Sequence, residues 1–407
     1  MRFREIPIIP TLPRILTLRP TMAVRMCRLL RAKVAKNASF YPPRISFCTK
    51  SDDWPVVKIQ DVERFIEDCM TKVGTRSAHA KSLASNLVAA DHRGHYSHGL
   101  NRLDMYVHDI SSRITVSDCE PKILSERAAT AHVDGCNLLG PVVGDFSMQL
   151  AISKAKTAGV GLVTAKNSNH YGIAGWYAMQ ASEQGLLGMS MTNTSPLSVP
   201  TRGQKPTLGT NPISLAAPAK PGDDFVLDMA TTTVALGKIE LHDRKQIPIP
   251  NSWGVDEQGK ESNDPKVVID KGGLMPLGGS EMTGGYKGYG LAMLVEILCG
   301  IMADADYGPN IRKWRNTDRI ANLGQCFLAI DPESFAPGFR DRMADLMHTC
   351  RTLPPAPGEE SVLVAGDPER QHMELCRRKS GIPYHPNQIQ FGKQLAEQLE
   401  VTPMKAL

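Results

Sequence analysis

Short apolar segments separated by glycine and proline occupy the middle of this 407-residue chain and limit how it can fold. They cover residues 129–134, 159–165, 188–192, 213–216 and 225–228, and their length and β-branched content predict strands. Among them, helical periodicity appears at residues 147–158 and 172–184. Strand and helix therefore do not alternate regularly, as they would in a doubly wound parallel sheet. We expect a mixed α/β protein of the α+β kind.

Helical patterns flank these strands on both sides. Residues 61–73 and 77–92 predict two helices, with Asp61 and Ser77 as N-caps, and residues 100–110 predict a third. A short strand is expected near residue 56. Later helices are expected at residues 289–302, 340–352 and 387–400, the last with Asn387 as a cap, and a strand at 326–330. About 350 residues of body exceed the roughly 250–300 that one core usually serves, so two subdomains are expected.

Charge separates a leader from this body. Residues 1–50 hold eleven Lys and Arg side chains and one acid, which leaves 36 basic and 41 acidic groups in residues 51–407. An Arg-rich segment with Ser, Thr and Leu and few acids is typical of a mitochondrial presequence. We therefore predict a presequence at residues 1–50 and a mitochondrial destination, or a cytoplasmic one if the leader is not a transit peptide.

The body's composition excludes several functions. Its mild acidity argues against nucleic-acid binding, which needs a positive face. The most apolar stretch, residues 290–302, is too short for the roughly 20 residues that span a bilayer, so no membrane insertion is expected. No segment matches the Gly-x-Gly-x-x-Gly turn or the phosphate-binding loop. A dinucleotide, if bound, is not bound in a Rossmann fold.

The densest group of reactive side chains lies between two predicted helices and contains His92, His95, Ser97, His98 and Arg102. A histidine exchanges protons near neutrality, and an adjacent serine hydroxyl can orient it. An arginine holds a carboxylate through two parallel hydrogen bonds. These groups suit oxidation of a 2-hydroxy acid.

Two other interpretations of this group remain open. His92 and His95 can belong to an ordinary helix C-terminus, with Gly94 as the cap. Alternatively, His92, His95 and His98 can bind a metal ion in a metal-dependent hydrolase, although zinc sites more often include a ligand distant in sequence. We assign no metal site.

Two further segments are candidates for anion binding. Residues 166–175 place His170 between an apolar strand and a helix start rich in small residues, where backbone N–H groups can face a phosphate. Residues 284–290 place Lys287 near a second helix start. Tight turns and a glycine hinge are the structural alternatives. Hydroxyl-rich loops at residues 192–196, 209–212 and 228–233 can line a polar ligand or form ordinary turns.

Six motifs in order resemble the type-2 malate/L-lactate dehydrogenase family, with its ureidoglycolate and sulfolactate dehydrogenase relatives. They are residues 91–103 (DHRGHYSHGLNRL), 167–172 (NSNHYG), 209–212 (GTNP), 228–230 (DMA), 285–291 (GYKGYGL) and 366–370 (GDPER). The resemblance implies an NAD(P)-dependent oxidoreductase of malate or lactate type. It also implies a non-Rossmann cofactor fold on a largely antiparallel sheet with a helical domain, and a homodimer.

The resemblance also implies roles for individual residues. His98 would donate the proton to the 2-oxo group with Ser97 as its relay, and Arg102 and Thr210 would bind the substrate. The histidine that matches His170 is an alternative acid/base. Cofactor contacts are expected from His170, Tyr171, Gly172, Ile173, Ala174, Thr194, Asp228, Met229, Ala230, Lys287, Gly366, Glu369 and Arg370. We assign residues 55–140 and 300–400 to the helical, substrate-binding domain and residues 141–299 to the cofactor-binding domain.

Overall fold

The structure is a computed structural model that describes residues 54–314 and 316–407. The chain divides into two units, Met1–Ser51 and Asp52–Leu407, and the second contains every described residue. The predicted presequence lies outside the described residues. Within them, no helix is long and apolar enough to cross a membrane.

A seven-stranded sheet forms the centre of the body, with the order β2-β3-β4-β10-β5-β6-β7. Only the β3–β4 pair is parallel, so the expected largely antiparallel sheet is confirmed. The strands are β2 (Lys122–Glu126), β3 (Thr130–Asp134), β4 (Val160–Ser168), β5 (Leu187–Thr192), β6 (Ile213–Lys220), β7 (Asp223–Met229) and β10 (Leu323–Ile330). Short pairs form between β1 (Val56–Val57) and β11 (Ile382–Pro383), and between β8 (Gly254–Val255) and β9 (Gly273–Leu274).

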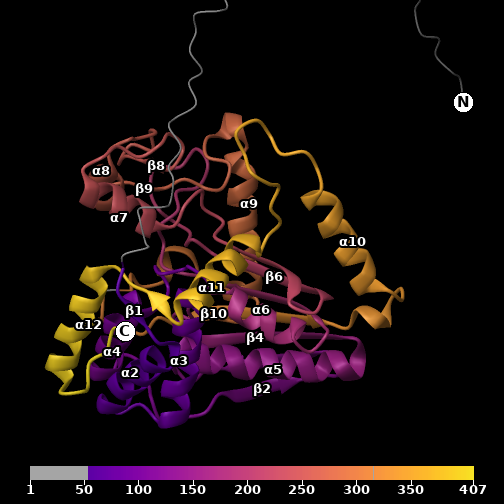
Figure 1. Ribbon diagram of the computed structural model, residues 1–407, viewed down its shortest axis with the longest axis horizontal. Helices are drawn as coiled ribbons and strands as arrows, with labels where there is room; N and C mark the ends of the chain where they lie inside the picture. The colour runs from indigo at the N-terminus through magenta and orange to yellow at the C-terminus, as the bar shows by residue number, and fades with distance from the viewer. Residues whose placement is uncertain (1–53, 315) are drawn as a thin grey trace, which may run out of the picture. The chain divides into compact units, whose positions relative to one another are not determined.

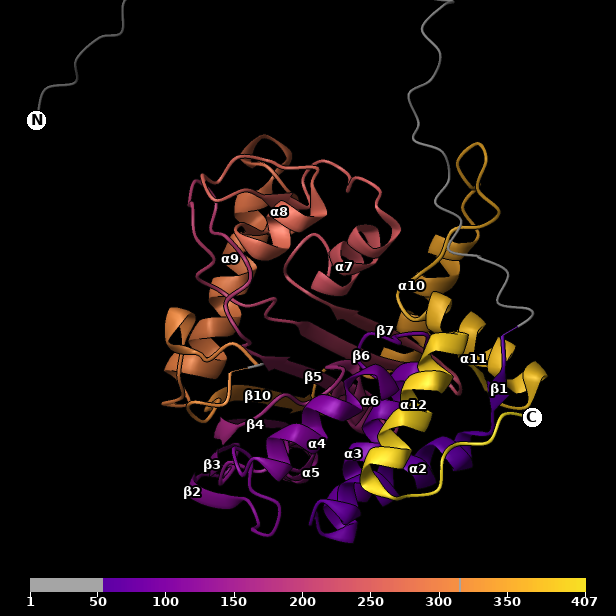
Figure 2. The ribbon, with the colours of Figure 1, turned by 90° about the vertical axis from the view of Figure 1, so that its left-hand side faces the viewer.

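Helices lie on both sides of this sheet (Figures 1 and 2). One side carries most of them: α2 (Ile59–Lys72), α3 (Ser77–His92), α4 (Leu103–Ser111), α5 (Gly140–Ala158) and α6 (Gly175–Ser182). The other side carries α7 (Leu236–Lys245), α8 (Pro265–Asp270) and α9 (Gly285–Val295). The later helices are α10 (Phe339–Arg351), α11 (Asp367–Lys379) and α12 (Pro386–Leu399).

The main core lies between the sheet and the first group of helices. It contains Phe65, Leu87, Tyr177 and Phe327, all of which are fully buried. Asp145 on α5 joins three helices, because its carboxylate accepts hydrogen bonds from Ser82, Trp176 and Gln180. Buried polar groups of this kind specify how helices meet when every partner is satisfied.

One face of α9 and of the π-helical turn that follows it, η4 (Glu296–Ile301), is apolar and exposed. Its side chains recur three, four or seven residues apart, which places them along one side of the helix. The row contains Tyr286, Met293, Leu294, Ile297 and Ile301, and Met302 follows directly. A continuous apolar row on a surface is typical of an interaction site.

Several expected helix starts are wrong. α2 and α3 begin after Lys58 and Arg76 rather than with Asp61 and Ser77 as caps, and His385 rather than Asn387 caps α12. The helix expected from residue 147 begins at Gly140, with a proline in its first turn. The helix expected from Gly172 begins at Gly175, because Gly172 has a φ of +76°, which an α-helix excludes.

The expected strands and the remaining expected helices are present within a few residues of their predicted bounds. The sequence did not predict α7, α8, α11, β2 or the two-residue strands β8, β9 and β11. The sheet takes strands from both predicted domains. The assignment of residues 55–140 and 300–400 to one domain and 141–299 to another stays a prediction.

Candidate functional site

The loop after α3 carries the predicted catalytic group. Gly94 has a φ of +85° and ends the helix, as expected for a C-terminal cap. Beneath the loop lies buried Asp91, whose Oδ2 accepts the Leu100 N–H (2.9 Å) and the Tyr384 hydroxyl (2.7 Å). Burial raises the pKa of Asp91 to about 7. The loop and the short 3₁₀ turn η2 (Leu100–Arg102) are thereby tied to the C-terminal segment.

Ser97, His98 and Arg102 lie together at this loop. The Ser97 hydroxyl contacts His98 Nδ1 at 2.9 Å, and Arg102 Nε donates to the Ser97 carbonyl at 2.7 Å. Among the described residues, no carboxylate forms an ion pair with Arg102. Arg102 Nη1 makes only a long contact with Met105 Sδ (4.0 Å), so the guanidinium can still bind an external carboxylate. Gly237 at the start of α7 packs against Ser97, so α7 borders the group.

His170 joins this group from the end of β4. Its ring is nearly parallel to that of His98, with centroids 5.8 Å apart and an interplanar angle of 19°. The Gly172 N–H donates to His170 Nδ1 (3.2 Å), so this nitrogen is an acceptor and the proton of the neutral ring is on Nε2. The Tyr106 hydroxyl lies 2.6 Å from the same nitrogen and donates to it.

Both histidines are held neutral. Burial, and then the charges of Arg102 and His95, lower the pKa of His98 to about 4. Burial, with His98 and Arg102, lowers the pKa of His170 well below its ordinary value. Strong pKa shifts with named charged neighbours are typical of functional sites.

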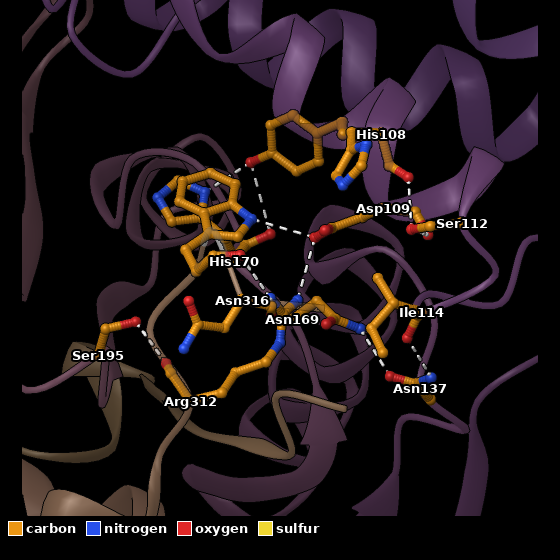
Figure 3. A network of polar contacts seen from close by, with 12 residues as sticks. His108, Asp109, Ser112, Ile114, Asn137, Asn169, His170, Ser195, Arg312 and Asn316 are labelled. Carbon is orange, nitrogen blue, oxygen red and sulfur yellow. Dashed lines mark hydrogen bonds and ion pairs between the residues drawn. The ribbon is translucent and has the colours of Figure 1, made fainter. Parts of the chain in front are cut away.

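A second set of residues supports His170, and sequence analysis did not identify it (Figure 3). The Trp314 ring stacks on His170 with centroids 4.0 Å apart. Asp109 accepts hydrogen bonds from Trp314 Nε1 (3.0 Å) and Arg312 Nη2 (3.2 Å). Tyr106 could have been found, because it follows Arg102 by four residues on a predicted helix. Nothing in the local sequence indicates that residues 312–314 reach His170.

The alternative interpretation, a metal site of His92, His95 and His98, is not supported by the arrangement of these side chains. His95 faces Glu369, with Nε2 and Oε1 3.4 Å apart, while His98 contacts Ser97 and the His92 carbonyl accepts from His372. Within residues 54–314 and 316–407, no group of three His, Cys, Asp or Glu side chains could hold a metal ion. The metal-dependent hydrolase therefore loses its structural basis.

The predicted anion site at the start of α6 is filled by the protein itself. The Gly175 N–H donates to Asp228 Oδ2 at 2.7 Å, and a Cβ at Gly175 would touch this carboxylate. Burial raises the pKa of Asp228, against the opposing effect of His95. A second acid lies nearby, because Asp228 and Glu369 both interact with His95 and Arg93.

Glu369 enters the site from the first turn of α11, which Gly366 precedes with a φ of +101°. Burial opposes its ionisation, but its hydrogen bond with His95 and the charges of His95 and Arg93 lower its pKa. Glu369 Oε2 is buried and has no hydrogen-bond partner within the described residues. An acceptor in this position fits the hydroxyl or amide donors of a nicotinamide nucleotide.

The other predicted cofactor residues differ in their surroundings. Tyr171 is fully buried and its hydroxyl contacts Ser190, so only its backbone can face a ligand. Ile173 and Ala174 are also buried, Met229 ends β7, and Ala230 follows it. Arg370 pairs with Asp367 and Asp223, and it donates to the Asp224 carbonyl. These contacts commit Arg370 to the junction of α11 and β7.

The last three predicted ligand-binding residues are Thr194, Thr210 and Lys287. The Thr210 N–H donates to Thr194 Oγ1 (2.9 Å), and the two hydroxyls are 3.3 Å apart. Within the part of the chain that the structure describes, neither hydroxyl bonds to Ser97, His98 or His170. Lys287 is exposed and lies 5.9 Å from the centroid of the neighbouring Tyr286 ring. The roles of all three stay predictions.

Comparison with known proteins identifies the family. The family model of malate/L-lactate dehydrogenase matches residues 57–391. The chain belongs to this family. It is 40% identical over 340 residues to a malate dehydrogenase of Pyrococcus abyssi, which covers 83% of this chain and 93% of that relative.

Two further relatives extend the comparison. The chain is 31% identical over 326 residues to the ureidoglycolate dehydrogenase (NAD(+)) of Escherichia coli O157:H7, covering 79% of this chain and 90% of the relative. The crystal structure of malate dehydrogenase from Entamoeba histolytica matches with a TM-score of 0.82 and 32% identity, over 86% of this chain and 99% of that one. The resemblance and the fold class expected from the sequence are confirmed, and this family member is a dehydrogenase.

Because the charge of Arg102 lies close to His98, a substitution of Arg102 should change the pKa of His98. Replacing Arg102 by Gln should raise the pKa of His98 from about 4 towards the ordinary histidine value, because a like charge is removed. Histidine proton NMR against pH measures this midpoint. The exposed Arg113 offers a matched control, and Arg113→Gln should leave the midpoint in place. An equal midpoint in the wild type and in Arg102→Gln would contradict the assigned contact.

Proposed function

We propose that this protein transfers a hydride between a 2-hydroxy acid of malate or lactate type and NAD or NADP. The observation that carries the proposal is the joining of Ser97, His98, Arg102 and His170 in one partly buried group. It combines a carboxylate-binding guanidinium with neutral imidazoles that can exchange a proton. A 2-hydroxy acid has both functions that these groups recognise, a carboxylate and an adjacent hydroxyl.

Arg102 is proposed to bind the substrate carboxylate. Its Nε donates to the Ser97 carbonyl, which holds the plane of the guanidinium, and a two-pronged contact with a carboxylate would replace the long contact of Nη1 with Met105 Sδ (4.0 Å). The bound carboxylate would offset the charge of Arg102. Because this charge lowers the pKa of His98, substrate binding would make His98 a stronger base.

His98 is favoured over His170 as the acid/base. During oxidation, a base must take the hydroxyl proton and become an imidazolium with N–H groups on both nitrogens. His98 Nδ1 faces the Ser97 hydroxyl, which can accept a hydrogen bond. His170 Nδ1 faces the Gly172 N–H, which can only donate, so protonation there would oppose two donors. His170 would instead donate its Nε2–H to the substrate oxygen.

Asp228 and Glu369 are proposed to hold the nicotinamide nucleotide beside this group. Glu369 Oε2 is a buried acceptor that can take a hydroxyl or amide donor, and Asp228 keeps the start of α6 in place. When bound, the nicotinamide ring would accept the hydride from the substrate carbon. The name of the ureidoglycolate relative supports NAD(+) as one candidate.

Two further proposals concern assembly and location. We propose a homodimer formed through the exposed apolar row on α9 and η4, because this row repeats at helical spacing and a second copy would remove it from water. We also propose that residues 1–50 direct the protein to mitochondria, supported by their basic, acid-poor composition. Import by isolated mitochondria of the full chain, but not of a chain lacking residues 1–50, tests the second proposal.

The activity itself is tested by absorbance. Oxidation of NADH and of NADPH should be followed with a panel of 2-oxo acids that includes oxaloacetate and pyruvate. We expect turnover with at least one acid and one cofactor, and none with the matching ketones that lack a carboxylate, because Arg102 then has no partner. Absence of turnover across the whole panel would refute the proposed function.

The two histidines should respond differently to substitution. His98→Gln should lower kcat by roughly 10²–10⁴-fold, the usual contribution of a general base. His170→Gln should cost less, because the amide N–H can still donate to the substrate oxygen. Steady-state kinetics with the best substrate of the panel measure both. A larger loss in His170→Gln than in His98→Gln would reverse the assignment.

Dimer formation is tested by a charge in the apolar row. Ile297 is 48% exposed, and Ile297→Glu should produce a monomer because a buried, unpaired carboxylate is costly. Leu346 on α10 is 57% exposed and provides the matched control, since Leu346→Glu should remain dimeric. Sedimentation equilibrium measures the mass. A wild-type monomer, or a dimer of Ile297→Glu, would contradict the proposed interface.

A further inference from the structure

The ring of His170 makes aromatic contacts that the chemistry above does not use. Trp314 lies parallel to His170, with 4.0 Å between centroids and 20° between planes. Tyr106 contacts both rings edge-on, at 5.9 Å from His170 and 5.6 Å from Trp314. The edge of His170 and one of its faces are therefore covered by aromatic side chains.

The placement of Trp314 depends on a buried ion pair. Asp109 and Arg312 are only 6% and 2% exposed, and the Asp109 Oδ2 atom takes both Arg312 Nη2 and Trp314 Nε1. Burial raises the pKa of Asp109, while Arg312 and the indole N–H oppose this. Removing one partner of such a buried ion pair strongly destabilises the folded protein, because it leaves the other charge buried and unpaired.

Arg312 also shapes the loop that carries the indole ring. Its Nη1 donates to the carbonyls of Trp314 and Asn316, and its own carbonyl accepts from the Ser195 hydroxyl at 2.7 Å (Figure 3). This segment between η5 (Gly308–Asn310) and β10 contains no helix or strand in its described residues. Hydrogen bonds from the Arg312 side chain to backbone carbonyls therefore hold this segment in place of regular secondary structure.

One helix face supplies the rest of the support. Arg102, Tyr106 and Asp109 are spaced by four and three residues, so they form a row along η2 and α4. Arg102 faces the proposed carboxylate, Tyr106 holds His170 Nδ1, and Asp109 holds Trp314. The groups with charge or titratable protons around His170 are thus His98, Arg102 and Tyr106.

From this arrangement we propose that Trp314, held by the Asp109–Arg312 pair, is a positioning residue that keeps His170 parallel to His98 and shielded from water. The inference rests on the proposed function for its kinetic consequence. Trp314 does not need to touch the substrate. It acts by preventing His170 from rotating away from the direction that Tyr106 and Gly172 define.

The central test compares Trp314→Ala with Trp314→Phe. Loss of the ring should lower kcat about 10- to 100-fold, the range expected when a reacting group is misplaced by about 1 Å. The KM for the 2-oxo acid should change little, because Arg102 and Ser97 are untouched. Trp314→Phe retains a stacked ring and should stay close to the wild type. A wild-type kcat in Trp314→Ala would overturn the proposal.

A second measurement does not depend on activity. The His170 titration, followed by histidine proton NMR, should move up towards about 6.5 in Trp314→Ala, because water would reach the ring. It should stay low in Trp314→Phe. The matched control is Trp253→Phe, since Trp253 also packs against a histidine, His242, with centroids 5.1 Å apart. An unmoved His170 midpoint in Trp314→Ala would overturn the shielding role even if the wild type proves inactive with every acid tested.

The role of the Asp109–Arg312 ion pair can be tested without altering the Trp314 side chain. Arg312→Lys removes the planar fork that joins Asp109 to two carbonyls, and it should lower kcat in the same direction as Trp314→Ala. If both act through His170, the double variant Arg312→Lys/Trp314→Ala should be no slower than Trp314→Ala alone. Additive losses in kcat would show that Arg312 acts elsewhere. Should Trp314→Ala fail to fold, Trp314→Leu retains apolar volume without a stacked ring and should show the same loss.

Discussion

The insertion of β10 between β4 and β5 organises this protein. This strand arrives after more than a hundred residues of intervening chain and pairs antiparallel with both neighbours. Because β10 is buried along most of its length, its position is determined by both strands and by the helices beneath. The segment that leads into β10 must therefore pass the end of β4. His170 lies beyond that end, so Trp314 and Arg312 are carried to it.

The site is consequently assembled from three distant segments with different tasks. The loop after α3 supplies Ser97, His98 and Arg102, and buried Asp91 fixes its exit. The end of β4 supplies His170 in a single tautomer. The segment before β10 supplies the indole ring that covers it. Each reactive group has a support from another segment, which is how a site reaches the precision that proton and hydride transfer require.

The body is acidic although its proposed ligands are anions. Residues 51–407 contain five more acidic than basic groups, so attraction of a carboxylate or a nucleotide must come from individual residues. Arg102 lacks an ion-pair partner among the described residues, whereas Arg351 and Arg370 are paired with Asp223 and Asp367. The family motif containing Arg370 thus includes a side chain used to hold α11, and Glu369 next to it reaches the site.

The sequence by itself determined most strands of the central sheet, most helices, the family and the grouping of Ser97, His98 and Arg102. Hydrophobic periodicity and adjacency are local properties that a single segment contains. The tertiary structure decided which groups are paired and which are free. In the folded chain, His95 faces Glu369, the Asp228 carboxylate accepts the N–H at the start of α6, and Trp314 stacks on His170. These contacts join residues far apart in sequence, so their partners are known only once the sheet order is known.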